Sequence, residues 1–296
     1  MSATRQSTSS NTARVAIHGA MILALSLATA QSLHAMPDNI CSSQRMNAGL
    51  ALGATTAAAA VATSLELQGM QKENAWHMAS EPSRKAVFVD PSSHLHSLGS
   101  YYLAKSATSS FITRSCSDSI TTQLVRRAAL KGAAVSITLG AIKEVADGWY
   151  NGFSMTDLSV DALGAGFALA QSYVAPLRHV TPSITVSPAA LRNAGVRQAA
   201  FDYGNQTLWF SANVHEMLPS SVASAWPKAV RLSAGRRAKS GGVDNAFIIG
   251  LDLDAAQLPG NNPAWSRVKN ALHNVRLPGP AIVMGPNGTS MVGLYW

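Results

Sequence analysis

Residues 140–147 carry the groups in this chain that are best placed to do chemistry. Gly140, Lys143, Glu144 and Asp147 fall at positions i, i+3, i+4 and i+7 of a helix predicted over 121–147. At that spacing they share one stripe about 100° wide. The stripe presents two carboxylates, one amine and one small residue to whatever packs against it.

A second stripe of the same kind follows on a helix predicted from 155 to about 174. Asp157, Asp161 and Gly164 lie on one face of it. A six-residue turn, 149–154, makes the two helices antiparallel neighbours. Small residues let helix backbones approach closely. We therefore expect the two stripes to face each other.

Carboxylates crowded into a poorly hydrated seam need raised pKa values, bound protons or a cation. The candidate counter-charges are Lys143, one of the histidines of a predicted helix over 94–106, and a divalent metal ion. If the seam is catalytic, Glu144 or Asp147 acts as the base. The remaining candidates are then ligands or orienting groups: Asp157, Asp161 and His96.

Other interpretations of these residues stay open. Lys143 and Asp147, four residues apart, suit an exposed ion pair worth a few tenths of a kcal/mol. Asp157 also stands three residues after Ser154, as in a capping box in which Asp replaces the usual Glu. The metal signal of His94 and His96 is weak, because side chains two residues apart on a helix diverge by about 200°. A solvated surface, a buried structural network and a functional site are all compatible with the pattern.

The start of the chain predicts a signal peptide over residues 1–35. Arg5 and Arg14 precede an apolar run, 15–30, that ends in Ala28-Thr29-Ala30. A basic start, an apolar core and an A-x-A end are the three parts of a secretory signal. The run is shorter than the roughly 20 residues of a membrane span. We expect an exported protein of the periplasm or outer membrane.

The composition suits a membrane surface better than nucleic acid. Charged residues make up 13% of the chain, about half the usual share, and the net charge is +8. Without Arg5 and Arg14 the chain keeps 21 basic and 15 acidic residues, a net charge of +6. An excess of that size suits anionic lipid. It is too scattered for a nucleic-acid stripe.

Two cysteines, Cys41 and Cys116, allow a disulfide in an oxidising compartment, or two unpaired thiols. The residues before Cys41 are unlike a lipid-attachment site. Motifs for serine hydrolases, zinc proteases and phosphate loops are absent from the sequence. No cofactor is predicted, apart from the divalent metal ion that the acidic stripes would accept.

The predicted fold class is α+β, with a helical domain over 47–180 and a smaller β-rich domain over 185–296. Period-two alternation predicts five short antiparallel strands in the second domain. One helix over 262–275 interrupts them, with Asn262 as N-cap and Pro263 at its first position. An apolar stripe on that helix, including Trp265 and Val268, is expected to pack on the sheet.

The two acidic stripes together resemble the YfiM-type family of periplasmic lipoproteins without an assigned activity. The resemblance rests on Gly140-x-x-Lys143-Glu144-x-x-Asp147 and on Ser154-x-x-Asp157-Leu158-x-x-Asp161-x-x-Gly164. Upstream, the family's Asp-x-x-x-His and Ser-Tyr pattern is similar to Asp90 with His94, or to His96 with Ser100-Tyr101. The resemblance implies export and adds no reaction. Without a lipid-attachment cysteine it implies no lipid anchor here.

The favoured function is a membrane-associated envelope protein with a structural or assembly role, whose partners are the membrane surface or envelope lipids. One alternative is a metal- or acid/base-dependent envelope enzyme acting on lipid or glycan. A second alternative is a strand-rich outer-membrane component.

Overall fold

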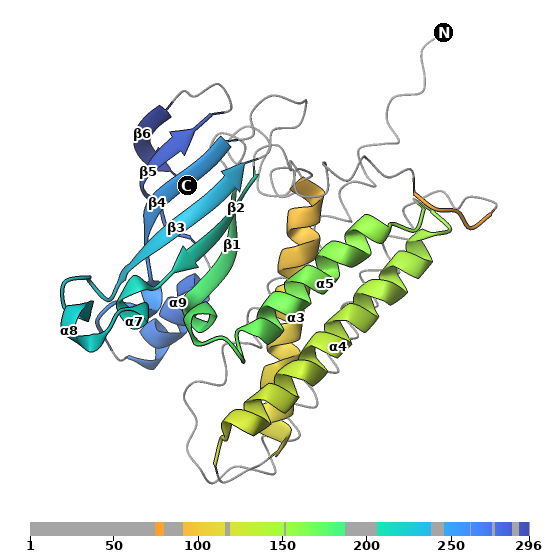
Figure 1. The fold of residues 1–296 in the computed structure, drawn as a ribbon, viewed down its shortest axis with the longest axis horizontal. Coiled ribbons are helices and arrows are strands. Elements are labelled where there is room, and N and C mark those ends of the chain that lie inside the picture. Colours follow the sequence, from red (N-terminus) through yellow and green to blue (C-terminus); the bar gives the residue numbers. More distant parts are fainter. Residues whose placement is uncertain are drawn as a thin grey trace. The chain divides into compact units, whose positions relative to one another are not determined.

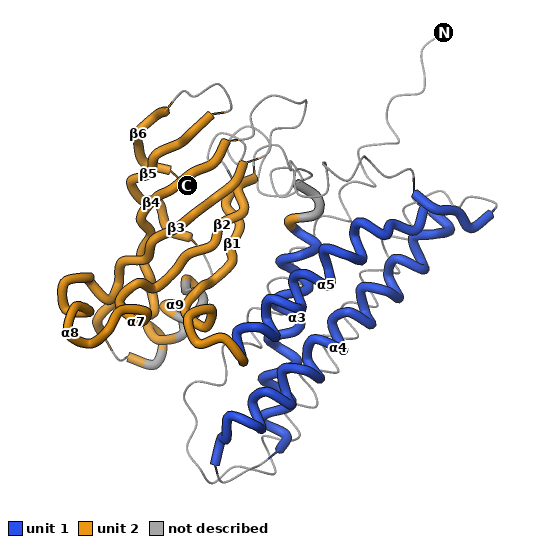
Figure 2. Tube along the Cα trace, viewed as in Figure 1, with its two compact units in different colours: residues 1–87, 95–172 blue, residues 88–94, 173–296 orange. Residues whose placement is uncertain are grey.

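A computed structural model describes nine stretches of the chain, which are residues 75–79, 91–115, 119–150, 152–186, 206–237, 246–260, 262–273, 276–285 and 290–295. The chain divides into two compact units (Figure 2). Unit 1 comprises residues 1–87 and 95–172, and unit 2 comprises residues 88–94 and 173–296. The predicted signal peptide and both cysteines lie outside the described residues.

Three helices run side by side in the described part of unit 1 (Figure 1). They are α3 (Pro91–Ser115), α4 (Thr122–Asp147) and α5 (Met155–Ala170). The prediction for α4 is confirmed within one residue, whereas α3 is longer than the predicted 94–106 and α5 ends before 174. The prediction ended this helix at 106 because the residues that follow are rich in Ser and Thr. Thr108 and Thr113 instead donate their hydroxyls to carbonyls four residues back, so they fit the helix.

The ends of α4 and α5 follow from local sequence. The Thr121 side chain caps α4 by accepting the Leu124 N–H at 3.2 Å, and Gly148 ends the helix. The Ser154 side chain caps α5 by accepting the Asp157 N–H at 3.0 Å. A capping box also requires the Asp157 carboxylate to accept the Ser154 N–H. That part of the prediction is wrong, because the Ser154 N–H donates to Glu144 at 3.3 Å. The carboxylate of Asp157 is therefore left for the seam.

Small residues set the spacing of the three helices. A Cβ added to Gly132 of α4 would lie 2.5 Å from the Ala104 carbonyl oxygen of α3. Between the same helices the Ser100 and Ser136 hydroxyls lie 2.7 Å apart, and both residues are buried. The close approach that glycine permits brings side chains of all three helices to one seam.

A short extended segment, residues 75–79, fixes the turn between α4 and α5. The His77 N–H donates to the Gly148 carbonyl at 2.9 Å, and the Phe153 N–H donates to the His77 carbonyl at 2.9 Å. The indole of Trp76 donates to the Val145 carbonyl at 3.2 Å. These bonds fix the position of Ser154, whose N–H holds Glu144.

Unit 2 contains a six-stranded antiparallel sheet whose spatial order, β1-β2-β3-β4-β5-β6, is the sequence order (Figure 1). The strands are β1 (Val180–Val186), β2 (Gln206–Ala212), β3 (Val230–Arg237), β4 (Ala246–Leu253), β5 (Gly279–Met284) and β6 (Ser290–Tyr295). The α+β fold class is confirmed. The predicted count of five strands is wrong, because β1 contains Pro182, which suggested a break rather than a strand. Proline is tolerated there since β1 is an edge strand of the described sheet.

The inner face of the sheet is polar as well as apolar. Trp209 and Ile248 are fully buried on it, and Arg231 pairs there with Asp252 at 2.6 Å. The Arg276 guanidinium lies 3.6 Å from the centre of the Trp209 ring and donates to the Tyr295 and Leu251 carbonyls. Burial lowers the pKa of Arg276 to about 10.

The helices that the structure describes in unit 2 are short, apart from α9 (Pro263–His273). They are η1 (Ala175–His179), α7 (Val214–Met217), α8 (Ser220–Ala223) and η3 (Ala255–Gln257). Asn262 caps α9, as predicted, by accepting the Ala264 N–H at 2.8 Å. The expectation that its apolar stripe packs on the sheet is wrong, because Trp265 and Val268 are exposed. Lys269 is buried instead and donates to the Leu258 and Gly260 carbonyls.

Among the described helices, none combines the length and the apolar character needed to cross a membrane.

Candidate functional site

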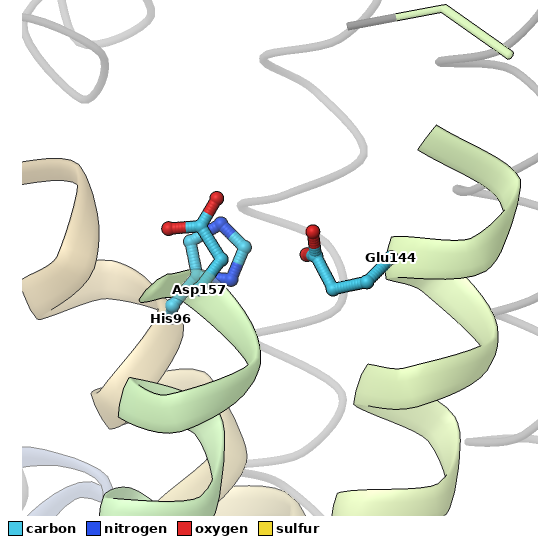
Figure 3. A group of neighbouring side chains, drawn as sticks. All are labelled: His96, Glu144 and Asp157. Carbon is cyan, nitrogen blue, oxygen red and sulfur yellow. The ribbon is translucent and has the colours of Figure 1, made fainter. Parts of the chain in front are cut away.

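One side chain from each of the three helices of unit 1 points into a common space (Figure 3). His96 comes from α3, Glu144 from α4 and Asp157 from α5. One nitrogen or oxygen atom from each of them lies within 4.8 Å of the other two. Glu144 is only 1% exposed, while His96 and Asp157 are half-buried. The group therefore opens toward solvent on the side of His96 and Asp157.

Lys143 neutralises part of the acidic charge next to this group. Its ammonium lies 3.1 Å from Glu144 Oε1 and 2.6 Å from Asp147 Oδ2. Burial alone would lower the pKa of Lys143, but Asp147 and Glu144 raise it above its ordinary value. Burial raises the pKa of Glu144, and Lys143 opposes that rise only in part. Glu144 is thus a carboxyl that holds a proton more readily than an exposed one.

Asp161 lies behind His96 on the side of the ring that carries Nδ1. The distance from Nδ1 to Asp161 Oδ1 is 3.6 Å. Burial lowers the pKa of His96, but the neighbouring carboxylates of Asp161 and Asp157 raise it by more, so the pKa lies above its ordinary value. Gly140 makes room for this carboxylate, since an added Cβ would lie 2.7 Å from Asp161 Oδ2.

The donor set suits a divalent metal ion of the first transition row. One imidazole and two carboxylates are ligands that zinc and manganese accept. Bonds of about 2.0–2.2 Å would set such ligand atoms roughly 3.3 Å apart. The present separations, within 4.8 Å, therefore need to shrink by up to about 1.5 Å on binding, which side-chain rotation can supply.

The structure brings together most of the residues that the sequence singled out. Glu144, Asp147 and Asp161 are buried in the seam between α4 and α5, and Asp157 lies at its edge. The predicted convergence of the two acidic stripes is thus observed. Asp147 lies outside the donor set and pairs with Lys143.

The two histidines of α3 have different surroundings. His96 reaches the seam, whereas the donor group found among the described residues does not include His94, which is buried elsewhere on the helix. The Tyr101 hydroxyl donates to Gln171 at 3.1 Å, and its ring contacts Phe167, so it ties α3 to the end of α5. Burial raises the pKa of Tyr101, which keeps the hydroxyl protonated.

Two contributions to the site were not predicted. One is the Ser154 N–H, which sequence reasoning assigned to the helix cap alone. The other is segment 75–79, which fixes the turn before α5. No sequence signal marks either contribution, because the Ser154 N–H and most of the bonds of segment 75–79 belong to the backbone.

Comparison with known proteins adds no relative: no family model, curated protein or solved structure matches this chain, so the resemblance to the YfiM-type family remains a prediction from its motif.

Proposed function

We propose that this chain is an exported cell-envelope protein whose three-helix unit binds a divalent metal ion through His96, Glu144 and Asp157. The observation that carries the proposal is the convergence of one donor atom from each of three helices within 4.8 Å. The bound ion would tie α3 to the α4–α5 hairpin. Its main role would be to hold the unit together.

The charges in the seam support a cation. Glu144, Asp147, Asp157 and Asp161 bring four negative charges when ionised, and Lys143 returns one positive charge. A neutral His96 leaves the seam at −3, and a divalent ion reduces this to −1. Without a cation the protein must retain protons on buried groups. The raised pKa values of His96 and Glu144 agree with this, because a raised pKa favours the protonated form.

Asp161 is placed as the orienting partner of the metal-binding histidine. Metal-bound histidines commonly use their second ring nitrogen to donate to a carboxylate, which fixes the ring and strengthens the ligand. The 3.6 Å separation of His96 Nδ1 and Asp161 Oδ1 is longer than a hydrogen bond, so this arrangement requires the two groups to move closer when Nε2 binds the metal. Gly140 leaves room for the Asp161 carboxylate at this position.

A second candidate function is hydrolysis of an envelope lipid or glycan. Three protein ligands, rather than four, are typical of metal sites that keep a position for a water molecule. The half-buried His96 and Asp157 leave the group accessible from one side. In that case His96, Glu144 and Asp157 would hold the metal ion, which would supply an activated water, and Lys143 beside the site would stabilise developing negative charge.

Metal binding is tested on the purified mature protein by equilibrium dialysis against zinc and manganese, with the metal counted by mass spectrometry. We expect one ion per chain. Glu144→Gln should weaken binding by about 100-fold or more, and Asp161→Asn by about 10- to 100-fold. The matched controls are Glu216→Gln and His179→Gln, in unit 2, which should bind as the unaltered protein does. Equal binding by Glu144→Gln and Glu216→Gln would contradict the site.

The pH dependence of stability should reverse when the metal is bound. The folded-state pKa values of His96 and Glu144 lie above 6.5 and 4.5, so folding favours their protonated forms. Metal-free stability from these groups should therefore fall as pH rises from about 4.5 through the raised pKa of His96. A metal needs both groups deprotonated, so the stabilisation it adds should grow over the same interval.

The measurement is the melting temperature between pH 5 and 8, with a chelator and with excess zinc. If the melting temperature changed with pH in the same way with the chelator and with zinc, these groups would bind no metal. Export is tested separately by the N-terminal sequence of the protein recovered from the cell envelope, which should begin after Ala30 or Ala35.

A further inference from the structure

The outer face of the unit 2 sheet carries a row of apolar side chains that crosses all six strands. Directly opposed residues of antiparallel strands share a face, so the pairing register defines this row. Its members are Pro182, Phe210, Ala234, Ile249, Ile282 and Val292. The next row along the strands is also apolar, with Val180, Ala212, Leu232, Leu251 and Leu294 at outward positions.

Much of this surface is exposed. Ile249 and Ile282, which face each other across β4 and β5, are 41% and 47% exposed, and Val292 is 81% exposed. Phe210, Leu232, Leu251 and Leu253 are exposed as well. Monomeric soluble proteins rarely expose contiguous apolar patches above a few hundred Å². Isolated apolar residues would need no explanation, but two adjoining rows on one sheet do.

The two faces of the sheet do not show the division of polar and apolar residues that is usual when water lies outside. The inner face buries the Arg231–Asp252 ion pair and the hydrogen-bonded hydroxyls of Ser211 and Ser233. A sheet with one face in water normally places apolar residues inside and polar residues outside. Here the outward-facing rows match an apolar surrounding.

The charged residues of unit 2 indicate that this apolar surrounding is lipid. The only ionisable residue at an outward position of the described strands is Arg236, at one end of the sheet between Leu208 and Phe247. Residues 185–296 hold ten Lys and Arg against five Asp and Glu. Arginine next to an apolar surface, in a unit with excess positive charge, suits the boundary between lipid tails and anionic headgroups. A protein partner would more often bring polar contacts into such a face.

The sheet can lie flat against the bilayer surface. The outward residues of β4 extend from Phe247 to Leu253, which is about 20 Å at roughly 3.4 Å per residue. An open sheet has unpaired backbone groups along its edge strands, and such groups do not enter the hydrocarbon core. The outward apolar side chains can therefore reach the lipid tails while the strand edges and Arg236 stay at headgroup level.

We propose that the outer face of β1–β6 is a lipid-binding surface, which seats unit 2 on an anionic phospholipid bilayer. The surface is separate from the metal-binding group, whose donors all belong to unit 1. It gives the expected membrane association a defined location. It also explains why the inner face retains the ionic and hydroxyl groups.

The proposal is tested by flotation of the purified mature protein with vesicles of phosphatidylglycerol and phosphatidylethanolamine, and with vesicles of phosphatidylcholine alone. We expect binding to the anionic vesicles and weaker binding to the neutral ones. The double variant Ile249→Gln and Ile282→Gln should lower binding by about tenfold or more, because it removes two opposed apolar groups. Both side chains are exposed, so the variant should stay folded, which circular dichroism verifies.

The matched control is Ile142→Gln, an exposed isoleucine on α4 of unit 1, which should bind vesicles as the unaltered protein does. Arg236→Gln should reduce the preference for anionic vesicles and leave neutral binding unchanged. Absence of vesicle binding would overturn the proposal. So would equal losses in Ile142→Gln and the double variant. A dimer in ultracentrifugation that only the double variant dissociates, without vesicle binding, would assign the face to a second copy of the chain.

Discussion

Replacing Arg231 by Met is expected to destabilise unit 2 by about 3–5 kcal/mol. The guanidinium of Arg231 lies 2.6 Å from Asp252 Oδ2, and the two side chains are only 2% and 0% exposed. Removal of the arginine leaves a carboxylate that is buried without its cation. A charge in that position costs far more than the ion pair contributes. The nearby Arg276 attracts Asp252 and should recover a small part of the loss.

The effect is measured by guanidinium denaturation followed through tryptophan fluorescence, since Trp209 reports on the same face of the sheet. Arg236→Met is the matched control, because Arg236 belongs to the same strand but lies on the outward face of β3. The control makes the same chemical change without leaving a buried carboxylate unpaired. It should change stability by less than about 0.5 kcal/mol.

A second variant separates charge from packing. Adding Asp252→Asn to Arg231→Met removes the unpaired charge, while Asn keeps an oxygen that can accept the Leu277 N–H. The double variant should therefore be more stable than Arg231→Met alone. If Arg231→Met were as stable as the Arg236→Met control, the buried ion pair would have no structural role.

Replacing Gly164 by Ala is expected to destabilise unit 1 by about 3 kcal/mol, at the upper end of what overpacking costs. A Cβ at this position would lie 1.9 Å from the Ser97 carbonyl oxygen of α3. The obstacle is backbone, so no side-chain rotation relieves it, and α5 must move away from α3. Because α3 carries His96 and α5 carries Asp157, the same shift should weaken metal binding.

Gly166→Ala is the matched control, since it lies on the same helix and a Cβ there has nothing within 4 Å. Alanine is the better helix former, so this variant should be about 0.5–1 kcal/mol more stable than the unaltered protein. Urea unfolding monitored by circular dichroism gives both values. Equal stability of the two variants would mean that α3 and α5 are not in backbone contact at Gly164.

The sequence predicted the parts of the candidate site that depend on helical periodicity. The positions of Lys143, Glu144 and Asp147 on one stripe, and of Asp157 and Asp161 on the next, follow from a 3.6-residue repeat and a short turn. His96 was predicted as a ligand or orienting group of a catalytic seam, but the choice between His94 and His96 as the metal-binding histidine stayed open. That choice depends on how α3 is rotated against the other two helices, and the backbone contact at Gly164 contributes to this rotation.

For the strands, too, the sequence predicted one part of the structure and not another. Alternation of apolar residues located β2, β3 and β4, because these strands have one uniformly apolar face. It could not tell which face is buried, and the usual rule assigns the apolar face to the interior. In this sheet the buried side carries Arg231 and Asp252, and Ile249 and Ile282 lie outside. Trp209 and Ile248 are buried on that side as well, so the orientation depends on tertiary packing that no local pattern records.

The order of the strands has a kinetic consequence. Every described strand of the sheet pairs with its neighbour in sequence, so no pairing requires a later strand to insert between two earlier ones. Contacts that are local in sequence close short loops and form quickly, which shortens the lifetime of exposed strand edges. If the chain is exported N-terminus first through a translocation channel, as proposed, it could build this sheet hairpin by hairpin as it arrives. We therefore expect refolding of unit 2 from denaturant to be fast for a β-rich protein.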